Sequence, residues 1–259
     1  MSEQASRNTI TLVGGPTVLI EIGGLRLLTD PTFSPAGPQP SGAATLTKLT
    51  GPALSADEVG QIDAVLLSHD QHGDNLDAGG RAFLAKVPVV FSTPDAAARL
   101  RGNTVAIEPW RHATLDRAGN EPLKVIGVPA VHGPDGMESS SGQVTRFVLS
   151  AADIPTTYVS GDNVSLRVVE EVAHHLGPID VAVLFAGAAR TQRIDAYVSL
   201  TSDQVVDAAR ILGARAIVPV HAEGWGHYTQ GPDAIADAFK TAGLTDRLVR
   251  LQPGQSAAL

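Results

Sequence analysis

Short apolar runs separated by glycines open the chain. Residues 9–13, 17–22 and 25–29 are rich in β-branched and aliphatic side chains, and Gly-Gly pairs lie between them. Runs of this length that are bounded by turn-forming residues are typical of β-strands. The pattern predicts an antiparallel meander of three strands that ends at Asp30-Pro31.

Two stretches are rich in turn-forming residues and have no clear periodicity. The first runs from 32 to about 60 and is too long for an ordinary connection inside a compact domain. We expect a functional flap or a loosely structured rim there, with a linker between two domains as the alternative. The second, at 133–142, is flexible by composition and predicts a mobile flap or an ordinary exposed hairpin.

Elsewhere, apolar runs of strand length alternate with stretches of helical periodicity. Repeated strand–loop–helix units after a β-rich start predict mixed sheets with helices packed outside. The expected strands are residues 62–68, 89–92, 125–131, 157–160, 181–185, 214–220 and 248–251, and the expected helices are 76–87, 93–100, 164–176, 202–213 with Ser202 as N-cap, and 233–242.

Composition restricts the class of protein and its partners. The 259 residues are 43% hydrophobic and 18% charged, which is typical of a folded protein, and we treat 1–259 as a single domain. The net charge of −8 argues against nucleic acid or an anionic membrane as the main partner. A small-molecule substrate fits this charge better, and a homo-oligomer is left open.

The absence of cysteine leaves any soft-metal chemistry to the eight histidines. It also excludes disulfides, thiolate zinc sites and cysteine nucleophiles. The first residues contain neither the basic nor the apolar region of a secretory signal, and no apolar run approaches the roughly 18 residues of a membrane span. We therefore expect a cytoplasmic protein.

One strand-to-helix turn carries several side chains that can bind a metal. Residues 68–77 read SHDQHGDNLD. Because the preceding strand end is rigid and the loop is short, His69, His72 and Asp74 can point at a common centre. Neutral imidazole nitrogens and a carboxylate oxygen are the donors that a first-row metal ion requires.

Three other strand-like runs end in the same residue types, at His132, Asp162 and His221. Strand ends on one edge of a sheet converge in space, so these residues and the loop at 68–77 together predict a metal site. Taken singly, each histidine fits a buried core position equally well. Asp162 alone also fits the N-cap of the helix that follows it.

These motifs occur in an order that resembles the metallo-β-lactamase superfamily. The closest likeness is to the branch of ascorbate-6-phosphate lactonase and N-acyl phosphatidylethanolamine phospholipase D, and it covers roughly residues 9–254. It implies a mixed α/β (α+β) fold, a four-layer αββα sandwich with a metal site at one edge of the two sheets, and hydrolase activity. The motifs are Thr29-Asp30-Pro31, the loop at 68–77, the strand-end His132, Ser160-Gly161-Asp162 and Pro219-Val220-His221.

The resemblance implies six metal ligands. They are His69, His72 and His132 for a first metal, Asp74 and His221 for a second, and Asp162 as the carboxylate that bridges the two.

Two departures from the family pattern matter. Two residues separate His69 from His72 where the family usually has one, and Gln71 takes the place of the second histidine. We expect His72 to be the ligand, because it keeps the family's spacing to Asp74. Asn75 stands where the family has a further histidine, which should weaken the second position or favour a harder ion such as Mn²⁺.

Hydrolysis gives these residues distinct roles. A bound Zn²⁺ lowers the pKa of its water to about 7 and polarises the bond to be cleaved. Asp74 is the candidate to orient that water and to act as general base. Asp30 and Asp77 are candidates to fix the orientation of the imidazoles.

The loop after His221 is the candidate substrate pocket. His227 is a second catalytic candidate in this loop. As an alternative, Trp225 simply closes the core. The residues expected to line the pocket are Glu223, Trp225, His227 and Tyr228.

The sequence as a whole therefore predicts a metal-dependent hydrolase with one or two Zn²⁺ ions, or Mn²⁺. The bond cleaved would be an ester, lactone, amide or phosphodiester in a small cytosolic molecule. The alternatives are a non-catalytic metal-binding or ligand-sensing module whose second metal site has degenerated, and a purely structural protein.

Overall fold

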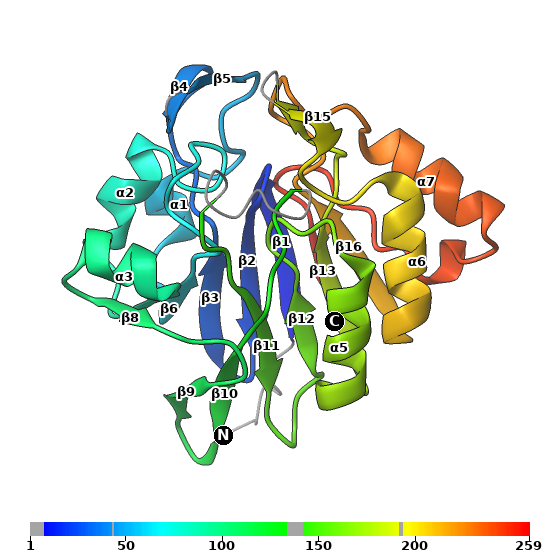
Figure 1. Ribbon diagram of the computed structural model, residues 1–259. Coiled ribbons are helices and arrows are strands. Elements are labelled where there is room, and N and C mark those ends of the chain that lie inside the picture. The colour runs from blue at the N-terminus through cyan, green and yellow to red at the C-terminus, as the bar shows by residue number, and fades with distance from the viewer. Residues whose placement is uncertain (1–7, 43, 134–141, 192–193) are drawn as a thin grey trace.

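Two β-sheets lie face to face in the middle of the molecule, and helices cover both outer faces (Figure 1). The computed structural model describes residues 8–42, 44–133, 142–191 and 194–259. No helix within these ranges combines the length and the apolar character needed to cross a membrane.

The first sheet grows from the predicted meander. β1 (Thr9–Gly14), β2 (Thr17–Ile22) and β3 (Leu25–Thr29) pair antiparallel. The glycine pairs between them adopt positive φ angles, which only glycine adopts without strain. Three parallel strands extend the sheet beyond β3, and a C-terminal strand pairs with β1 at the other edge: β6 (Ala64–Leu66), β7 (Val90–Ser92), β8 (Thr104–Ala106) and β17 (Ser256–Ala258).

The second sheet changes from antiparallel to parallel along its width. Its first four strands pair antiparallel, and its last two run parallel to β12. In chain order the strands are β9 (His112–Arg117), β10 (Asn120–Val128), β11 (Arg146–Ser150), β12 (Thr157–Val159), β13 (Val181–Phe185) and β16 (Ala216–Val220).

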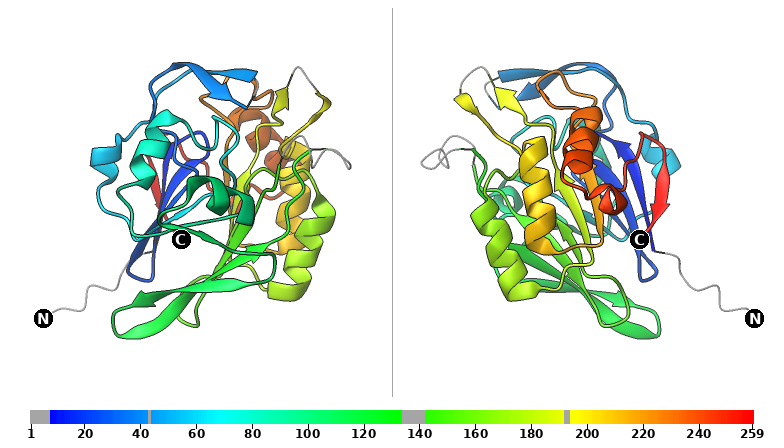
Figure 2. Two further views of the ribbon diagram at one scale, coloured as in Figure 1. Left: turned by 60° about the vertical axis from the view of Figure 1, so that its left-hand side comes forward. Right: turned by 90° about the vertical axis from the view of Figure 1, so that its right-hand side faces the viewer.

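Successive strand side chains point to opposite faces, so each sheet buries both of its faces. Ile20 and Ile22 of β2 lie in the apolar layer between the sheets, whereas Leu19 packs on the helix side. The result is a four-layer αββα sandwich, which confirms the predicted fold class (Figure 2). The outer layers are α1 (Ala56–Val59), α2 (Ala78–Leu84) and α3 (Pro94–Leu100) on the first sheet, and α5 (Leu166–Leu176), α6 (Ser202–Leu212) and α7 (Pro232–Thr241) on the second.

Two boundary predictions are wrong. The segment 248–251 is no strand: after the short 3-10 helix η1 (Thr245–Arg247), Leu248 makes a single bridge to Ile217, and the C-terminal strand is β17. The N-cap of α6 is Thr201 rather than Ser202, because the Thr201 hydroxyl accepts a hydrogen bond from the backbone of Gln204.

The segment from 32 to 60 is folded, which corrects the expectation of a loose rim or a linker. It forms a hairpin of β4 (Gly37–Ser41) and β5 (Ala44–Lys48), followed by α1. Backbone hydrogen bonds join the hairpin to the loop at 221–228. The Leu49 amide donates to the Gly224 carbonyl, and the Gly226 amide donates to the Thr47 carbonyl. A second small hairpin, β14 (Arg190–Thr191) and β15 (Ile194–Tyr197), rises beside it (Figure 1).

The capping box of α6 yields a stability prediction. The Thr201 hydroxyl and the Gln204 side chain satisfy each other's backbone amides. Thr201→Ala should therefore lower the free energy of unfolding by about 0.5–2 kcal/mol. Thr201→Ser keeps a hydroxyl that can cap the helix, so its free energy of unfolding should stay close to that of the wild type. Urea unfolding measures both, and equal losses in the two variants would contradict a capping role.

Candidate metal centre

The predicted ligands all follow the carboxyl ends of strands. His69, His72 and Asp74 come after β6, His132 after β10, Asp162 after β12 and His221 after β16. These strand ends meet at one edge of the sandwich, the upper edge in Figure 1, below the β4–β5 and β14–β15 hairpins. The fold therefore brings together side chains that are up to 152 positions apart in the sequence, from His69 to His221.

A first group of donor atoms converges around three imidazoles. His72 Nδ1 lies 2.8 Å from His69 Nε2 and 3.2 Å from His132 Nε2. Asp162 Oδ2 lies 4.0 Å from His69 Nε2 and 3.8 Å from His132 Nε2. Four donors within 4.8 Å of one another suit a single divalent cation.

A second group shares a residue with the first. His221 Nε2 lies 3.2 Å from Asp74 Oδ2 and 3.2 Å from Asp162 Oδ1. Asp162 thus offers one oxygen to each group. Asp162 would therefore be shared by the two groups if each held a cation.

Asp162 does not cap a helix. The N-cap of α5 is Ser165, three positions further on, so the capping alternative for Asp162 is wrong. The Asp162 side chain is instead buried among the imidazoles of His69, His132 and His221.

Neighbouring oxygens fix the orientation of three imidazoles. The Nδ1 atoms of His132 and His221 lie 2.9 Å from the carbonyl of Val198 and 3.2 Å from that of Ala186. In the neutral, metal-binding form of each imidazole, Nδ1 would therefore carry the proton and Nε2 would keep its lone pair for a metal.

His69 is held by a two-step relay. Its Nδ1 lies 2.9 Å from Ser68 Oγ, which donates in turn to Asp30 Oδ2 at 2.8 Å. Asp30 thus acts on the imidazole through Ser68 rather than directly. Sequence reasoning gave Ser68 no role, although it directly precedes the first histidine of the loop.

Burial favours the neutral form of two imidazoles in the first group, His69 and His132. Burial, reinforced by the neighbouring imidazoles, holds the pKa of His69 well below its usual value. Burial also lowers the pKa of His132, although the negative charge of Asp162 acts to raise it. Neutral imidazole is the form that binds a metal.

The second group has a surplus of negative charge. Burial opposes protonation of His221, but Asp162 and Asp74 outweigh it and raise the pKa of this imidazole to about 9. Burial also opposes the charge on Asp74, yet His227 and His221 keep its pKa well below the usual value. Two buried carboxylates therefore require positive charge beside them, which a divalent cation supplies.

Orphaned polar atoms gather at this edge. Among the described residues, eight buried side-chain nitrogen and oxygen atoms lack a hydrogen-bond partner. Buried polar atoms are normally paired, so a local excess of unpaired ones marks a site for a ligand. The five at this edge are Gln71 Oε1, Asn75 Oδ1, Asp162 Oδ1, His227 Nδ1 and Tyr228 Oη.

His72 Nδ1 is one of the converging donor atoms. The Gln71 side chain instead packs closely against the backbone of Gly142. The flap expected at 133–142 lies, for 134–141, outside the described residues.

The two residues that follow Asp74 in this loop differ in role. The Asn75 amide donates to Asp30 Oδ2 at 3.3 Å, so this side chain is turned toward Asp30. Among the residues that the structure describes, no hydrogen bond joins Asp77 to an imidazole, contrary to expectation. Its carboxylate accepts from Gly80 at the start of α2, and from the ammonium of the buried Lys48 at 3.0 Å.

The loop at 221–228 divides into two parts. His227 Nε2 lies 2.9 Å from Asp74 Oδ2. The Tyr228 ring packs beside both His221 and His227, with ring centroids 4.3 and 4.6 Å away, respectively. Glu223 is fastened to the backbone of Gly15, and Trp225 is 2% exposed beneath Lys48. Trp225 is therefore buried beside Gly15 and Lys48, and its assignment to a substrate pocket stays a prediction.

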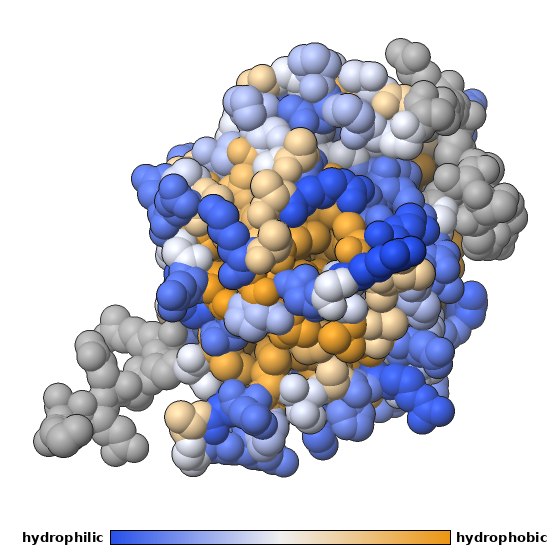
Figure 3. Space-filling view, turned by 90° about the vertical axis from the view of Figure 1, so that its left-hand side faces the viewer, coloured by the Kyte–Doolittle hydropathy of each residue, from blue (hydrophilic) through white to orange (hydrophobic). Residues whose placement is uncertain are grey.

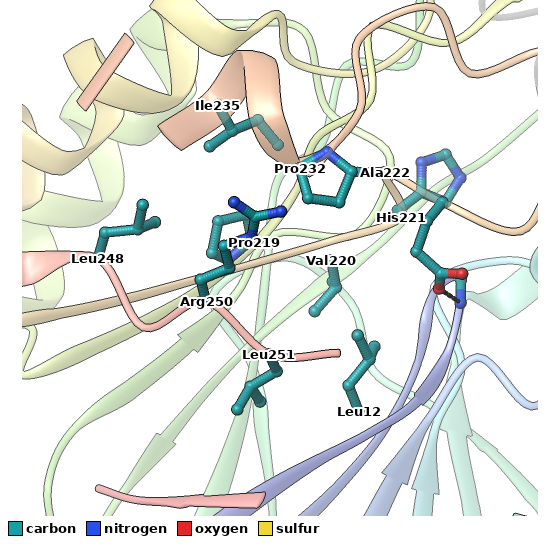
Figure 4. A pocket seen from close by; sticks show the side chains of 12 residues that line it. Leu12, Pro219, Val220, His221, Ala222, Pro232, Ile235, Leu248, Arg250 and Leu251 are labelled. Atoms are coloured by element: carbon teal, nitrogen blue, oxygen red, sulfur yellow. Dashed lines mark hydrogen bonds between the residues drawn. The ribbon is translucent and has the colours of Figure 1, made fainter. Parts of the chain in front are cut away.

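A narrow pocket adjoins the metal centre at His221 (Figure 4). It lies between β1, β16 and the start of α7, and Leu12, Val220 and Ile235 are typical of its lining. Of the six predicted ligands, only His221 borders it.

The competing ligand assignments can be separated by mutation. His72→Ala removes a converging donor, so it should weaken first-metal binding by more than the 10–100-fold typical of a lost outer contact. Gln71→Ala should leave binding unchanged. Metal analysis after dialysis against a weak chelator measures both, and the reverse pattern would assign the ligand to Gln71.

Comparison with known proteins identifies the family. Residues 25–222 match the Beta-lactamase superfamily domain. A UPF0173 metal-dependent hydrolase of Pyrococcus furiosus is 25% identical, over 96% of this chain and 99% of its own. An N-acyl-phosphatidylethanolamine-hydrolyzing phospholipase D of Caenorhabditis elegans is 22% identical over 85% of this chain, which spans only 64% of that protein.

Solved structures show the same fold. The crystal structure of a possible metal-dependent hydrolase from Veillonella parvula superimposes with a TM-score of 0.83 at 17% identity, over 98% of this chain and all of that one. The domain match covers most of the chain. The predicted ligands described above follow the strand ends within the matched residues. The chain belongs to the metallo-β-lactamase superfamily.

Proposed function

We propose that the protein is a hydrolase that uses one or two divalent cations bound at this edge. The observation that carries the proposal is the convergence of two donor groups on the shared carboxylate of Asp162. The unpaired buried atoms around it and the surplus negative charge support the same conclusion. The names of the relatives from Pyrococcus furiosus and Caenorhabditis elegans also describe hydrolases.

The donor sets favour different ions at the two positions. Three imidazoles at the first position suit Zn²⁺. The second position has two carboxylates and one imidazole, and Asn75 is turned toward Asp30, so a harder ion such as Mn²⁺ suits it better. When bound, such an ion lowers the pKa of a coordinated water to about 7 and polarises the scissile bond.

The protein's own residues would accept a proton from the attacking water and bind the substrate. His227 Nε2 and His221 Nε2 both approach Asp74 Oδ2, at 2.9 and 3.2 Å. The other carboxylate oxygen of Asp74 is left to accept a proton from the attacking water, as a general base does. His227 Nδ1 and Tyr228 Oη, both buried and unpaired, are suited to bind polar groups of a substrate.

The substrate is expected to be a small molecule with an ester, lactone, amide or phosphodiester bond. The net charge of −8 argues against nucleic acid and anionic membranes as partners. A cytoplasmic location and a homo-oligomer stay predictions from the sequence.

Turnover tests the proposal against the alternative of a metal-binding or sensing module. Protein loaded with Zn²⁺ or Mn²⁺ should hydrolyse at least one of a γ-lactone, an aryl ester and bis(p-nitrophenyl) phosphate. Asp74→Asn should lower kcat by about 10²–10⁴-fold, the usual range for a lost general base, while keeping the first ion. Fully loaded protein without turnover across a broad panel would favour the sensing module, and equal loss of first metal and activity would remove the general-base role.

A further inference from the structure

The loop between His69 and His72 is held from outside the metal centre by two arginines. Asp70 lies in this loop, and its side chain is only 4% exposed. Arg99 Nε donates to both carboxylate oxygens of Asp70, at 3.1 and 3.0 Å, and Arg99 Nη2 donates to Oδ1. Arg81 Nη2 donates to the backbone carbonyl of Asp70.

We propose that Arg99 and Asp70 are positioning residues for the first metal. Their ion pair fixes the longer loop of this chain so that the imidazoles of His69 and His72 converge. The proposal rests on the metal site proposed above, and it assigns a purpose to the departure from the family's spacing.

The geometry shows why the longer loop needs such an anchor. Two residues stand between His69 and His72, yet their donor nitrogens lie 2.8 Å apart. The Asp70 carboxylate is paired with Arg99 of α3, and the Gln71 side chain packs against Gly142. Displacing the loop would break the two-nitrogen contact between the Arg99 guanidinium and the Asp70 carboxylate, so the pair opposes movement of the loop.

The anchor itself is rigid. Arg99 lies on α3 and Arg81 on α2, the two helices that pack on the first sheet. They lie on the side of the molecule seen in Figure 3, where apolar surface is surrounded by hydrophilic side chains. The Thr93 side chain caps the start of α3 by accepting from Ala96. A forked guanidinium on such a helix fixes the direction of a carboxylate as well as its distance.

Loss of a positioning residue lowers metal affinity, whereas loss of a merely structural residue lowers the stability of the fold. The side chain of Arg99 is 43% exposed, so solvent screens the pair and its contribution to stability is small. The loss of a contact that orients a metal ligand typically weakens metal binding by about 10–100-fold. The clamp should therefore affect metal affinity more than the stability of the metal-free fold.

The test compares Arg99→Gln, Arg99→Lys and Asp70→Asn with the wild type. Arg210→Ala is the matched control, because Arg210 is an exposed helical arginine paired with Asp207 on the opposite layer. The readouts are Co²⁺ affinity by chelator competition, the visible spectrum of the first Co²⁺ bound, and Tm with and without metal.

We expect Arg99→Gln and Asp70→Asn each to weaken the first Co²⁺ by about 10–100-fold, to alter its spectrum and to reduce the rise in Tm on metal binding. Arg99→Lys should lie between them and the wild type, because an ammonium keeps the charge but not the fork. The double variant should lose no more than either single one.

Three results would overturn the clamp. In the first, Co²⁺ affinity and spectrum stay within twofold of wild type in Asp70→Asn and Arg99→Gln. In the second, Tm falls equally with and without metal while affinity is unchanged. In the third, Arg210→Ala weakens binding as much as Arg99→Gln. Wild-type protein that binds no Co²⁺ would overturn the metal site itself, which separates that failure from the failure of the clamp.

Discussion

The carboxylate of Asp162 is the point on which the arrangement depends. It lies, buried, between three imidazoles of one donor group and the Asp74–His221 pair of the other. Collecting charged and polar groups in a water-poor place is unfavourable unless they are paired. In the sandwich, the strand ends place the donors at one edge, where they pair with one another. Backbone carbonyls orient the imidazoles of His132 and His221. A divalent cation would supply the remaining charge.

The surrounding elements are fastened to this edge by a few polar contacts. Lys48 joins the β4–β5 hairpin to Asp77, which follows the ligand loop and caps α2. Arg99 joins the same loop to α3 through Asp70. Packing of the helices on the first sheet is thereby coupled to the positions of the ligands.

Local patterns predicted much of the fold and of the site. Glycine-bounded apolar runs predicted the meander, and histidines at strand ends predicted which side chains would converge. Contacts between distant segments were beyond such patterns. Asp77 was predicted to contact an imidazole, but its side chain pairs with Lys48. His227 contacts Asp74 although the two residues are 153 positions apart in the sequence. The C-terminal strand was misplaced because pairing with β1, rather than apolar content, selects residues 256–258.

Anomalous X-ray scattering from crystals of Zn²⁺-loaded protein tests the central claim most directly. We expect a strong zinc peak among His69 Nε2, His72 Nδ1, His132 Nε2 and Asp162, at about 2.0–2.2 Å from each. A second, weaker peak is expected beside Asp74 and His221. Zinc bound only elsewhere on the molecule, with no peak among the three imidazoles, would contradict the account.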